Sequence, residues 1–349
     1  MSGQADGEPT SGGKAAAELP RAYAPPPLRA VLRAQPEDFV VEELPGYDAD
    51  GSGEHVWLWV EKRGANTEWV ARQLAAFCGI PAADVGYAGL KDRHAVTRQA
   101  FSLHLPGKAG PDWSCFAAEG VKLLEVSRHG RKLKRGALRG NRFVLRLREV
   151  QGDRQRAERV MAAIAAGGVP NYFGEQRFGL DGRNLEQARA MFAGRRVRRE
   201  MRSLLLSAAR SQIFNEVLAA RVGLGTWNQA MDGDVWSLAG SHSWFGPEAC
   251  TPTLAARLAE GDIAPSGPLW GEGEPPSTDA ARALERSIAA AHPNLVAGLA
   301  AARMRHDRRA LRLLPRELRW HWPAPDTLEL SFELPAGSYA TVVVRELLQ

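Results

Sequence analysis

The order of its secondary-structure patterns is the feature that most constrains the fold of this 349-residue chain. Strand-like alternation of apolar and polar residues dominates residues 28–150, helical periodicity dominates residues 154–312, and strand patterns return from residue 318 onward. One sheet can be assembled from strands on both sides of a helical block, so this order indicates a helical domain inserted into one connection of a sheet domain. The spacing of these patterns alone also permits three consecutive domains, with no insertion.

The first block combines strand patterns with one amphipathic helix. His55–Val60 alternates aliphatic residues with tryptophans, and Arg142–Val150 alternates apolar residues with arginines, which is typical of a half-buried strand with a basic face. Between them an i, i+4, i+7 apolar series predicts a helix that is capped at Asn66 or Thr67 and ended by Gly79. The block therefore predicts an α+β fold with a mostly antiparallel sheet. Further strands are predicted at Phe39–Glu43, Val85–Leu90, Ala100–Leu105, Val121–Val126, Leu318–Trp322, Thr327–Phe332 and Ala340–Arg345, and helices at Arg154–Ala166, Leu185–Phe192, Ser203–Val222 and Thr278–Ala291, with a Gly- and Pro-rich connection at Pro265–Pro276.

A polar turn, Lys91–His94, lies between two of the predicted strands. It places the carboxylate of Asp92 between two cations at the end of a strand. Neighbouring positive charge favours the ionised form of an acid, and an ionised, locally desolvated carboxylate can act as a covalent nucleophile. The same arrangement is also typical of a surface ion pair, and the spacing alone leaves both interpretations open.

Basic residues gather in three runs, although the whole chain is only mildly basic. It has 45 Lys and Arg against 40 Asp and Glu, a net charge of +5, so the total charge alone is a weak indication of a polyanionic partner. The runs are able to neutralise phosphates of a folded RNA, and each is also compatible with a solvated face. They comprise nine Lys or Arg within Ser127–Arg148, then Arg195, Arg196, Arg198, Arg199 and Arg202, and finally Arg303, Arg305, Arg308, Arg309 and Arg312.

Cysteine and histidine placement argues against a disulfide scaffold and against a metal site. Cys78, Cys115 and Cys250 are far apart, and the eight histidines show no H-E-x-x-H pattern. This cysteine usage suits a reducing cytoplasm. We expect no membrane segment, because no long uncharged apolar stretch occurs. Residues 1–22 have almost no bulky apolar side chains and predict a disordered tail.

Four longer stretches carry a resemblance to a known family. Ala88–Thr97 resembles the catalytic motif of the TruD family of tRNA pseudouridine synthases. Three further stretches agree with that family in the same order, from about residue 30 to the C-terminal region, so only the first twenty-odd residues and some connections fall outside. These stretches are Pro36–Glu43, Pro170–Gly179 and Leu334–Thr341.

The resemblance implies a pseudouridine synthase catalytic domain that is discontinuous in sequence. We expect this domain at residues 23–166 and 307–349, with an α-rich TRUD domain inserted at residues 167–306. The implied activity is the isomerisation of uridine to pseudouridine in tRNA, at position 13, without a metal or other cofactor. We expect a cytoplasmic monomer whose partner is tRNA.

The resemblance also assigns roles to individual residues. Asp92 corresponds to the catalytic aspartate, whose carboxylate acts as nucleophile or base. Phe39, Asn141 and Phe332 correspond to positions that bind the target nucleotide, where an amide can read the imide edge of uracil. Arg33 occupies a position where the family typically has a basic residue, often Lys, and is our candidate for the cation that keeps Asp92 ionised. Without the resemblance, the phenylalanines would be interpreted as core residues, Asn141 as a turn residue and Arg33 as a surface residue.

Other classes of protein are compatible with parts of the sequence. A non-catalytic RNA-binding protein would use the same basic faces, although the intact motif around Asp92 argues against it. A pseudouridine synthase that acts on another RNA is a further alternative. A methyltransferase would need a Gly-rich turn after a strand, and a deaminase would need a His/Cys zinc motif. A glycosidase would need two working carboxylates. The first two signatures are not found in the sequence, and the stretch around Asp92 supplies only one carboxylate.

Overall fold

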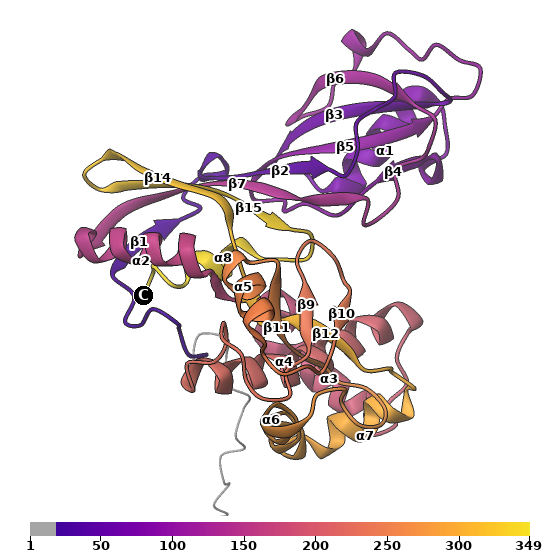
Figure 1. Cartoon of the computed structure of the whole chain (residues 1–349). Helices are drawn as coiled ribbons and strands as arrows, with labels where there is room; N and C mark the ends of the chain where they lie inside the picture. Colours follow the sequence, from indigo (N-terminus) through magenta and orange to yellow (C-terminus); the bar gives the residue numbers. More distant parts are fainter. Residues whose placement is uncertain (1–18) are drawn as a thin grey trace, which may run out of the picture. The chain divides into compact units, whose positions relative to one another are not determined.

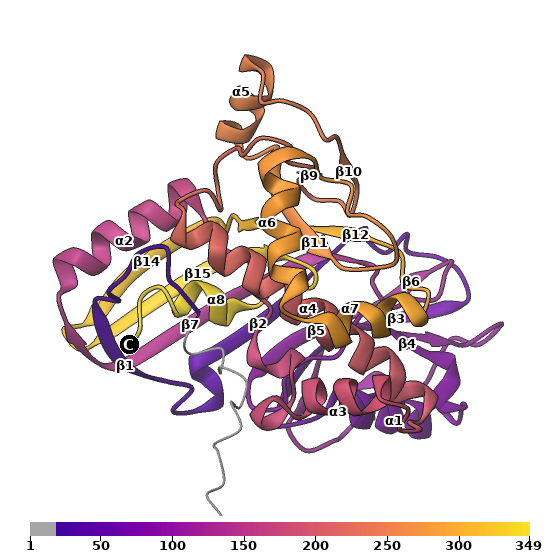
Figure 2. The same cartoon turned by 90° about the horizontal axis from the view of Figure 1, so that it is seen from below.

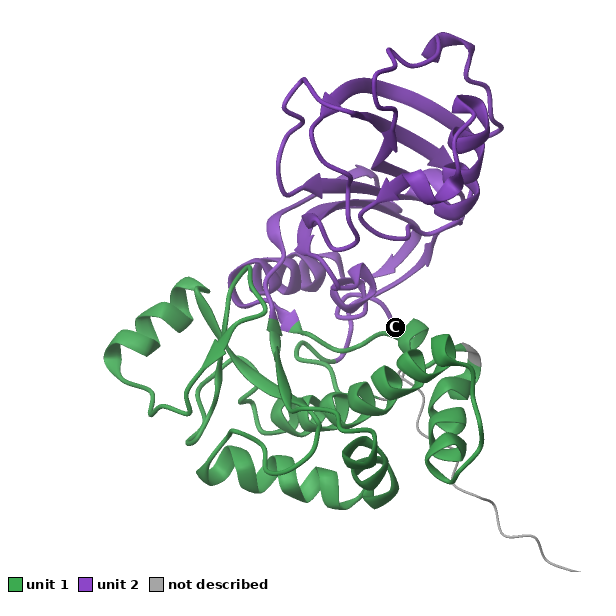
Figure 3. Cartoon of the chain, turned by 90° about the vertical axis from the view of Figure 1, so that its right-hand side faces the viewer, with its two compact units in different colours: residues 1–24, 170–312 green, residues 25–169, 313–349 purple. Residues whose placement is uncertain are grey.

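The computed structural model describes residues 19–349, so the tail expected at residues 1–22 lies mostly outside the described residues. The chain divides into two compact units (Figure 3). Unit 1 contains residues 170–312 together with 19–24, and unit 2 contains residues 25–169 and 313–349. Unit 2 is thus assembled from two segments that are separated in the sequence by unit 1.

Unit 2 is built on a nine-stranded sheet (Figure 1). Its strands are β1 (Leu28–Leu32), β2 (Phe39–Pro45), β3 (His55–Arg63), β4 (Val85–Tyr87), β5 (Val96–His104), β6 (Val121–His129), β7 (Leu138–Gly152), β14 (Arg316–Ala324) and β15 (Thr327–Pro335). The order is β14-β15-β7-β2-β5-β3-β6, with β1 paired to β7 and β4 to β5. β2 and β5 pair in parallel, and the other pairs of this sheet are antiparallel. The predicted α+β class with a mostly antiparallel sheet is confirmed.

Helix α1 (Thr67–Cys78) packs against one face of this sheet. Asn66 is its N-cap and Gly79, with a φ of 64°, ends it in the left-handed conformation, as the sequence predicts. Leu74 of the helix and Leu58 of β3 are fully buried in the same cluster. Successive strand residues point to opposite faces, so the neighbouring Trp57 belongs to a different cluster on the other face. The two faces of β3 therefore serve two separate environments.

Two helices complete unit 2. Helix α2 (Arg154–Gly167) runs beside β14 (Figures 1 and 2), where Glu158 accepts hydrogen bonds from the indole N–H groups of Trp320 and Trp322. The prediction of a strand at Ala340–Arg345 was wrong, because this segment forms helix α8 (Ala340–Val344). Its valines favour strands, but three consecutive ones are buried within unit 2, and packing overrides local preference there.

Unit 1 is a helical cluster joined to a small sheet. Helices α3 (Arg183–Phe192), α4 (Arg199–Gly223), α6 (Asp279–Ala290) and α7 (Pro293–Ala301) share one apolar core. The helices predicted from periodicity correspond to α2, α3, α4 and α6 and are confirmed, with ends shifted by at most four residues. Helices α7 and α5 (Pro252–Glu260) were not predicted. The sheet contains β10 (Trp244–Phe245), β9 (Trp236–Leu238), β11 (Ile263–Leu269) and β12 (Asp307–Ala310), and a separate strand pair contains β8 (Val169–Pro170) and β13 (Arg312–Leu313).

The predicted connection at Pro265–Pro276 contains most of strand β11. Prolines and a glycine concealed this strand, because proline cannot donate to a sheet ladder. The carbonyl of Pro265 still accepts a hydrogen bond from the N–H of Leu311 at 2.8 Å. The first half of β11 pairs with β9 and the second half with β12, so backbone pairing on two sides stabilises a sequence with little strand character.

Candidate active site

Asp92 lies in the connection between β4 and β5, residues 88–95, which we name the Asp92 loop. Its side chain is 44% exposed, and its Oδ2 lies 3.3 Å from Nη2 of Arg33. Arg33 directly follows β1 and has a φ of 62°, a left-handed conformation that is unfavourable for a residue with a side chain. The fold thus maintains a strained residue beside the Asp92 carboxylate, and such strain concentrates at functional sites.

The two cations adjacent to Asp92 in the sequence are not its partners in the structure. Lys91 turns away, and its Nζ lies 2.6 Å from Oε1 of Glu43 on β2, with both side chains buried. Nε of Arg93 donates to the carbonyl of Gly64 at 3.2 Å. The expectation that Lys91 and Arg93 hold the carboxylate between them was therefore wrong. Each has a partner elsewhere, and the neighbouring charge comes from Arg33.

A buried lysine binds the backbone of the Asp92 loop. Nζ of Lys62, near the end of β3, donates to the carbonyls of Ala65 at 2.7 Å, Asp92 at 2.9 Å and Lys91 at 3.4 Å. The Lys62 side chain is fully buried. Burial lowers the pKa of this amine from 10.5 to about 8, against the attraction of the nearby Asp92 carboxylate. One cation therefore fixes the backbone on which the Asp92 side chain is mounted.

Two more buried polar side chains bind the same loop. Oγ1 of Thr67 accepts a hydrogen bond from the N–H of Lys91 at 3.0 Å and donates to Oε1 of Gln99 at 2.9 Å. Nε2 of Gln99 donates to the carbonyl of Gly89 at 3.3 Å. With both side chains buried, the loop is tied to α1 and to β5 as well as to β3. Such a network limits the conformations available to Asp92.

These supporting residues were not predicted from the sequence, although a signal was present for two of them. Lys62 continues the core-facing series of alternate residues on β3, and Glu43 continues the series on β2. A charged residue at a core-facing position must be paired or hydrogen-bonded, because burying an unpaired charge is costly. Lys62 and Glu43 could therefore have been recognised as buried charged groups that each require an ion-pair or hydrogen-bond partner.

Phe39 and Phe332 lie in a buried aromatic stack with Phe143 at its centre. The ring of Phe143 stacks on Phe332 with centroids 5.6 Å apart and meets Phe39 edge-on at 6.3 Å. Phe39 and Phe332 are only 3% and 1% exposed. The guanidinium carbon of Arg33 lies 3.8 Å from the centroid of the Phe39 ring. Arg33 thus contacts both Asp92 and Phe39, while Phe332 is linked to this group through Phe143.

Asn141 is connected to the Asp92 loop through the sheet. On β7 it lies directly opposite Glu43 of β2, and Glu43 binds Lys91. Directly opposite residues share a face, with Cβ atoms about 5 Å apart. Phe143, two residues further along β7, shares that face and lies opposite Phe332. The buried side-chain oxygen of Asn141 has no hydrogen-bond partner among the described residues, so it is an acceptor that an imide N–H can satisfy.

The Pro170–Gly179 motif is built into unit 1 and has structural contacts. Oδ1 of Asn171 accepts a hydrogen bond from Nη2 of Arg309 at 2.7 Å, and the Arg309 guanidinium carbon lies 4.2 Å from the Phe173 ring centroid. Asn215 of α4 bonds to both the N–H and the carbonyl of Phe173, at 2.8 and 3.0 Å. These contacts explain why the motif identifies a fold without supplying a reacting group.

The three basic runs differ in how many of their charges are available. Three arginines of β7, Arg142, Arg146 and Arg148, each lie 2.8 Å from a carboxylate of a neighbouring segment. Arg308 and Arg312 of the third run are buried, and Arg308 pairs with a glutamate at 2.8 Å. The five arginines of the second run, by contrast, are exposed and form no ion pair with a described residue. Fewer cations are open to phosphates than the sequence predicts.

Comparison with known proteins places the chain in a family. The profile of tRNA pseudouridine synthase D (TruD) matches residues 21–187 and 183–347. The chain belongs to this family. A tRNA pseudouridine synthase D of Ectopseudomonas mendocina (strain ymp) is 53% identical over 334 residues, and one of Xanthomonas axonopodis pv. citri (strain 306) is 51% identical over 346 residues, each match covering 94% of both chains. The TruD resemblance of the sequence motifs is confirmed.

A solved structure shares the TruD fold of this chain. The crystal structure of a Methanosarcina mazei protein described as tRNA pseudouridine synthase D matches with a TM-score of 0.71 at 20% sequence identity. The match covers 94% of this chain and 95% of that one. No helix within residues 19–349 is long and apolar enough to cross a membrane. Within the same residues, no group of three or more His, Cys, Asp or Glu side chains is placed to hold a metal ion.

Proposed function

We infer that this chain is a tRNA pseudouridine synthase, and we propose position 13 of tRNA as the uridine that it isomerises. The bond between uracil N1 and ribose C1′ breaks, the base turns, and C5 bonds to C1′ while the C5 proton leaves and N1 is protonated. The atoms balance without a redox or energy donor, so we propose that no cofactor takes part. The TruD family and its relatives named tRNA pseudouridine synthase D support the assignment.

We assign Asp92 the role of nucleophile or base. Its carboxylate can attack C1′, add to the uracil ring, or abstract a ribose proton in a glycal route. Arg33 supplies the positive charge beside this carboxylate when substrate displaces water from the site. The observation that carries the proposal is the ion pair between Arg33 and Asp92, 3.3 Å apart. The loop that holds Asp92 is itself fixed by buried Lys62, which donates a hydrogen bond to the Asp92 carbonyl.

We propose that the target uridine is held by Phe39, Asn141 and Phe332. The unpartnered oxygen of Asn141 would accept the imide N–H of uracil, which distinguishes uracil from cytosine. Phe39 would form the aromatic wall next to Arg33. Phe332 would act mainly through its stack with Phe143, because only 1% of its surface is exposed.

We further propose that unit 2 is the catalytic domain and unit 1 the inserted domain that helps to hold tRNA. The exposed arginines of the second basic run, which begin just before α4, support a phosphate-binding role for unit 1. We propose that the protein acts as a monomer in the cytoplasm, since three well-separated cysteines suit a reducing compartment.

The experiment uses a tRNA transcript with tritium at C5 of uracil. Release of tritium to water reports the isomerisation directly, because the hydrogen on C5 leaves when C5 bonds to C1′. Mass alone cannot report the reaction of unlabelled tRNA, since pseudouridine is an isomer of uridine. The parent protein should release tritium, and Asp92→Asn should abolish release while tRNA affinity stays within a few-fold. Appreciable turnover by Asp92→Asn would refute the assignment of Asp92. A transcript that lacks uridine at position 13 tests the position, and unchanged release from it would refute that part.

A further inference from the structure

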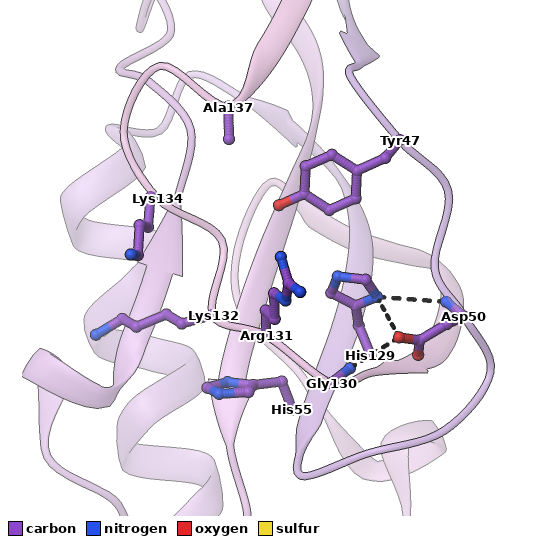
Figure 4. A pocket seen from close by; sticks show the side chains of 9 residues that line it. All are labelled: Tyr47, Asp50, His55, His129, Gly130, Arg131, Lys132, Lys134 and Ala137. Carbon is purple, nitrogen blue, oxygen red and sulfur yellow. Dashed lines mark hydrogen bonds and ion pairs between the residues drawn. The ribbon is translucent and has the colours of Figure 1, made fainter.

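Unit 2 contains a cavity of about 660 Å³ at the other end of β3 from the Asp92 loop (Figure 4). It is lined by His55, the first residue of β3, and by His129, the last residue of β6, together with the connections that flank these strands. His55 and Lys62 are seven residues apart on β3, which corresponds to about 23 Å at 3.3 Å per residue. A cavity of this volume accommodates a nucleotide-sized ligand.

Two histidines of this cavity are more than nine-tenths buried and have unpartnered ring nitrogens. Nδ1 of His129 lies 3.1 Å from Oδ2 of Asp50, and its Nε2 has no hydrogen-bond partner among the described residues. The same holds for Nδ1 of His55. Figure 4 shows the unpartnered nitrogen of His129 on the side of the Tyr47 hydroxyl and the Arg131 guanidinium. Buried polar atoms are nearly always partnered, so this wall is suited to a ligand with polar atoms.

The cavity has a cationic lining. Arg131, Lys132 and Lys134 line it, and both Arg131 and Lys134 are exposed without an ion pair to a described residue. Asp50 is the carboxylate among the lining residues, and it is already engaged by His129 and by the N–H of Gly130 at 3.2 Å. The charge that remains is positive, which favours an anion such as a phosphodiester.

An aromatic surface lies beside these cations. Tyr47 is 42% exposed, and its ring packs against Trp57 and His129 with centroids 5.5 and 5.3 Å away. A tyrosine ring that packs against neighbouring rings and is partly exposed can stack with a nucleobase. Phosphate-binding cations next to such a ring are the combination that proteins use for single-stranded nucleic acid.

We propose that this cavity is a second RNA-binding subsite that takes one unpaired nucleotide of the substrate. Arg131 and Lys134 bind its phosphodiester, Tyr47 stacks on its base, and His129 contacts a polar edge. The proposal rests on the proposed function, because an RNA substrate must reach both sites. The spacing of about 23 Å along β3 is within reach of one RNA strand of several nucleotides, so target and subsite nucleotides can belong to one tRNA.

The test measures the affinity of the full-length protein for an unmodified tRNA transcript in the Asp92→Asn background, where no turnover occurs. Tyr47→Ala should weaken binding by roughly 5- to 100-fold through lost stacking, and Tyr47→Phe should retain it. Arg131→Ala should reduce the slope of log affinity against log salt by about 0.7–0.9. The matched control is Arg72→Ala, which removes one exposed cation from α1, on the opposite sheet face, and should bind within twofold of the parent. A transcript carrying 4-thiouridine should cross-link to the cavity.

Affinities of Tyr47→Ala and Arg131→Ala that match the Arg72→Ala control would overturn the proposal. Inorganic phosphate or UMP that binds the cavity, while the transcript does not cross-link there, would show a free-anion site and overturn it too. Polyglutamate that binds there in place of RNA would assign the cavity to an acidic protein segment. Because binding is measured without turnover, absence of tritium release by the parent would refute the proposed function and leave this result standing.

Discussion

Replacing Glu43 by Gln tests whether the buried Lys91–Glu43 pair sets the position of Asp92. The side chains of Lys91 and Glu43 are 7% and 2% exposed, and the charged atoms are 2.6 Å apart. Removing one partner of a buried ion pair costs about 3–5 kcal/mol, because the other charge is left buried and uncompensated. Gln can still accept the hydrogen bond that Oε2 of Glu43 receives from the N–H of Ala100 at 3.0 Å, so the substitution mainly removes charge.

The uncompensated Lys91 ammonium should move toward water and carry the adjacent Asp92 with it. A displacement of about 1 Å at a reacting group can lower a rate by roughly 100-fold. We therefore expect Glu43→Gln to lower the free energy of unfolding by about 3–5 kcal/mol and the single-turnover rate of tritium release by roughly 10- to 100-fold. Urea unfolding and the tritium assay measure the two effects independently.

Two controls make this prediction refutable. Glu61→Gln breaks the half-exposed pair of Glu61 with Arg98, 2.9 Å apart, and should cost less than about 1 kcal/mol. In the double variant Glu43→Gln/Lys91→Met neither charge remains, so it should be more stable than the sum of the single effects predicts. Strict additivity, or a Glu43→Gln protein no less stable than Glu61→Gln, would show that the pair does not hold the loop.

Three further substitutions test other parts of the site. The folded-state pKa of Lys62, about 8, lies below its ordinary 10.5 because of burial, so between these pH values the unfolded chain holds a proton that the folded chain has lost. The unfolding free energy of the parent should therefore rise relative to Lys62→Met as pH increases from 8 to 10.5, and a pH-independent difference in urea unfolding would contradict this. Arg33→Met should lower kcat by at least roughly tenfold, and Arg33→Lys by less, since Lys restores the charge but not the planar contact with Phe39; equal losses in steady-state assays would argue against a charge effect. Phe332→Ala should destabilise the protein by about 3–5 kcal/mol because it leaves a cavity in the aromatic stack, and thermal unfolding unchanged from the parent would show that the ring is not a core residue.

The sequence predicts the elements whose signal is local. Helix α1 follows from its apolar spacing and from Gly79, and β7 follows from alternating Phe143, Leu145 and Leu147. β11 and α8 could not be predicted in the same way. The first is stabilised by pairing on two sides despite its prolines, and the second by burial of a valine run that locally favours a strand.

In the candidate site, too, the sequence predicts one part and not another. The motif around Asp92 locates the carboxylate, but the sequence suggests Lys91 and Arg93 as its charge partners, and both bind elsewhere. Adjacency along a turn does not determine which way a long side chain points, since that depends on acceptors provided by other strands. Arg33 could be proposed only through a family resemblance, because nothing in the spacing relates it to Asp92.

The split of unit 2 across the sequence has a consequence for synthesis on the ribosome. β15 pairs along β7 and places Phe332 on Phe143, yet it is translated after the 143 residues of Pro170–Arg312. Because translation proceeds at about 5–20 residues per second, that edge of β7 stays unpaired and Phe143 stays uncovered for on the order of ten seconds or more. An open strand edge beside exposed aromatic surface invites association with other chains. The nascent chain is thus most vulnerable to aggregation while unit 1 is being made, and this interval is when a chaperone would protect it.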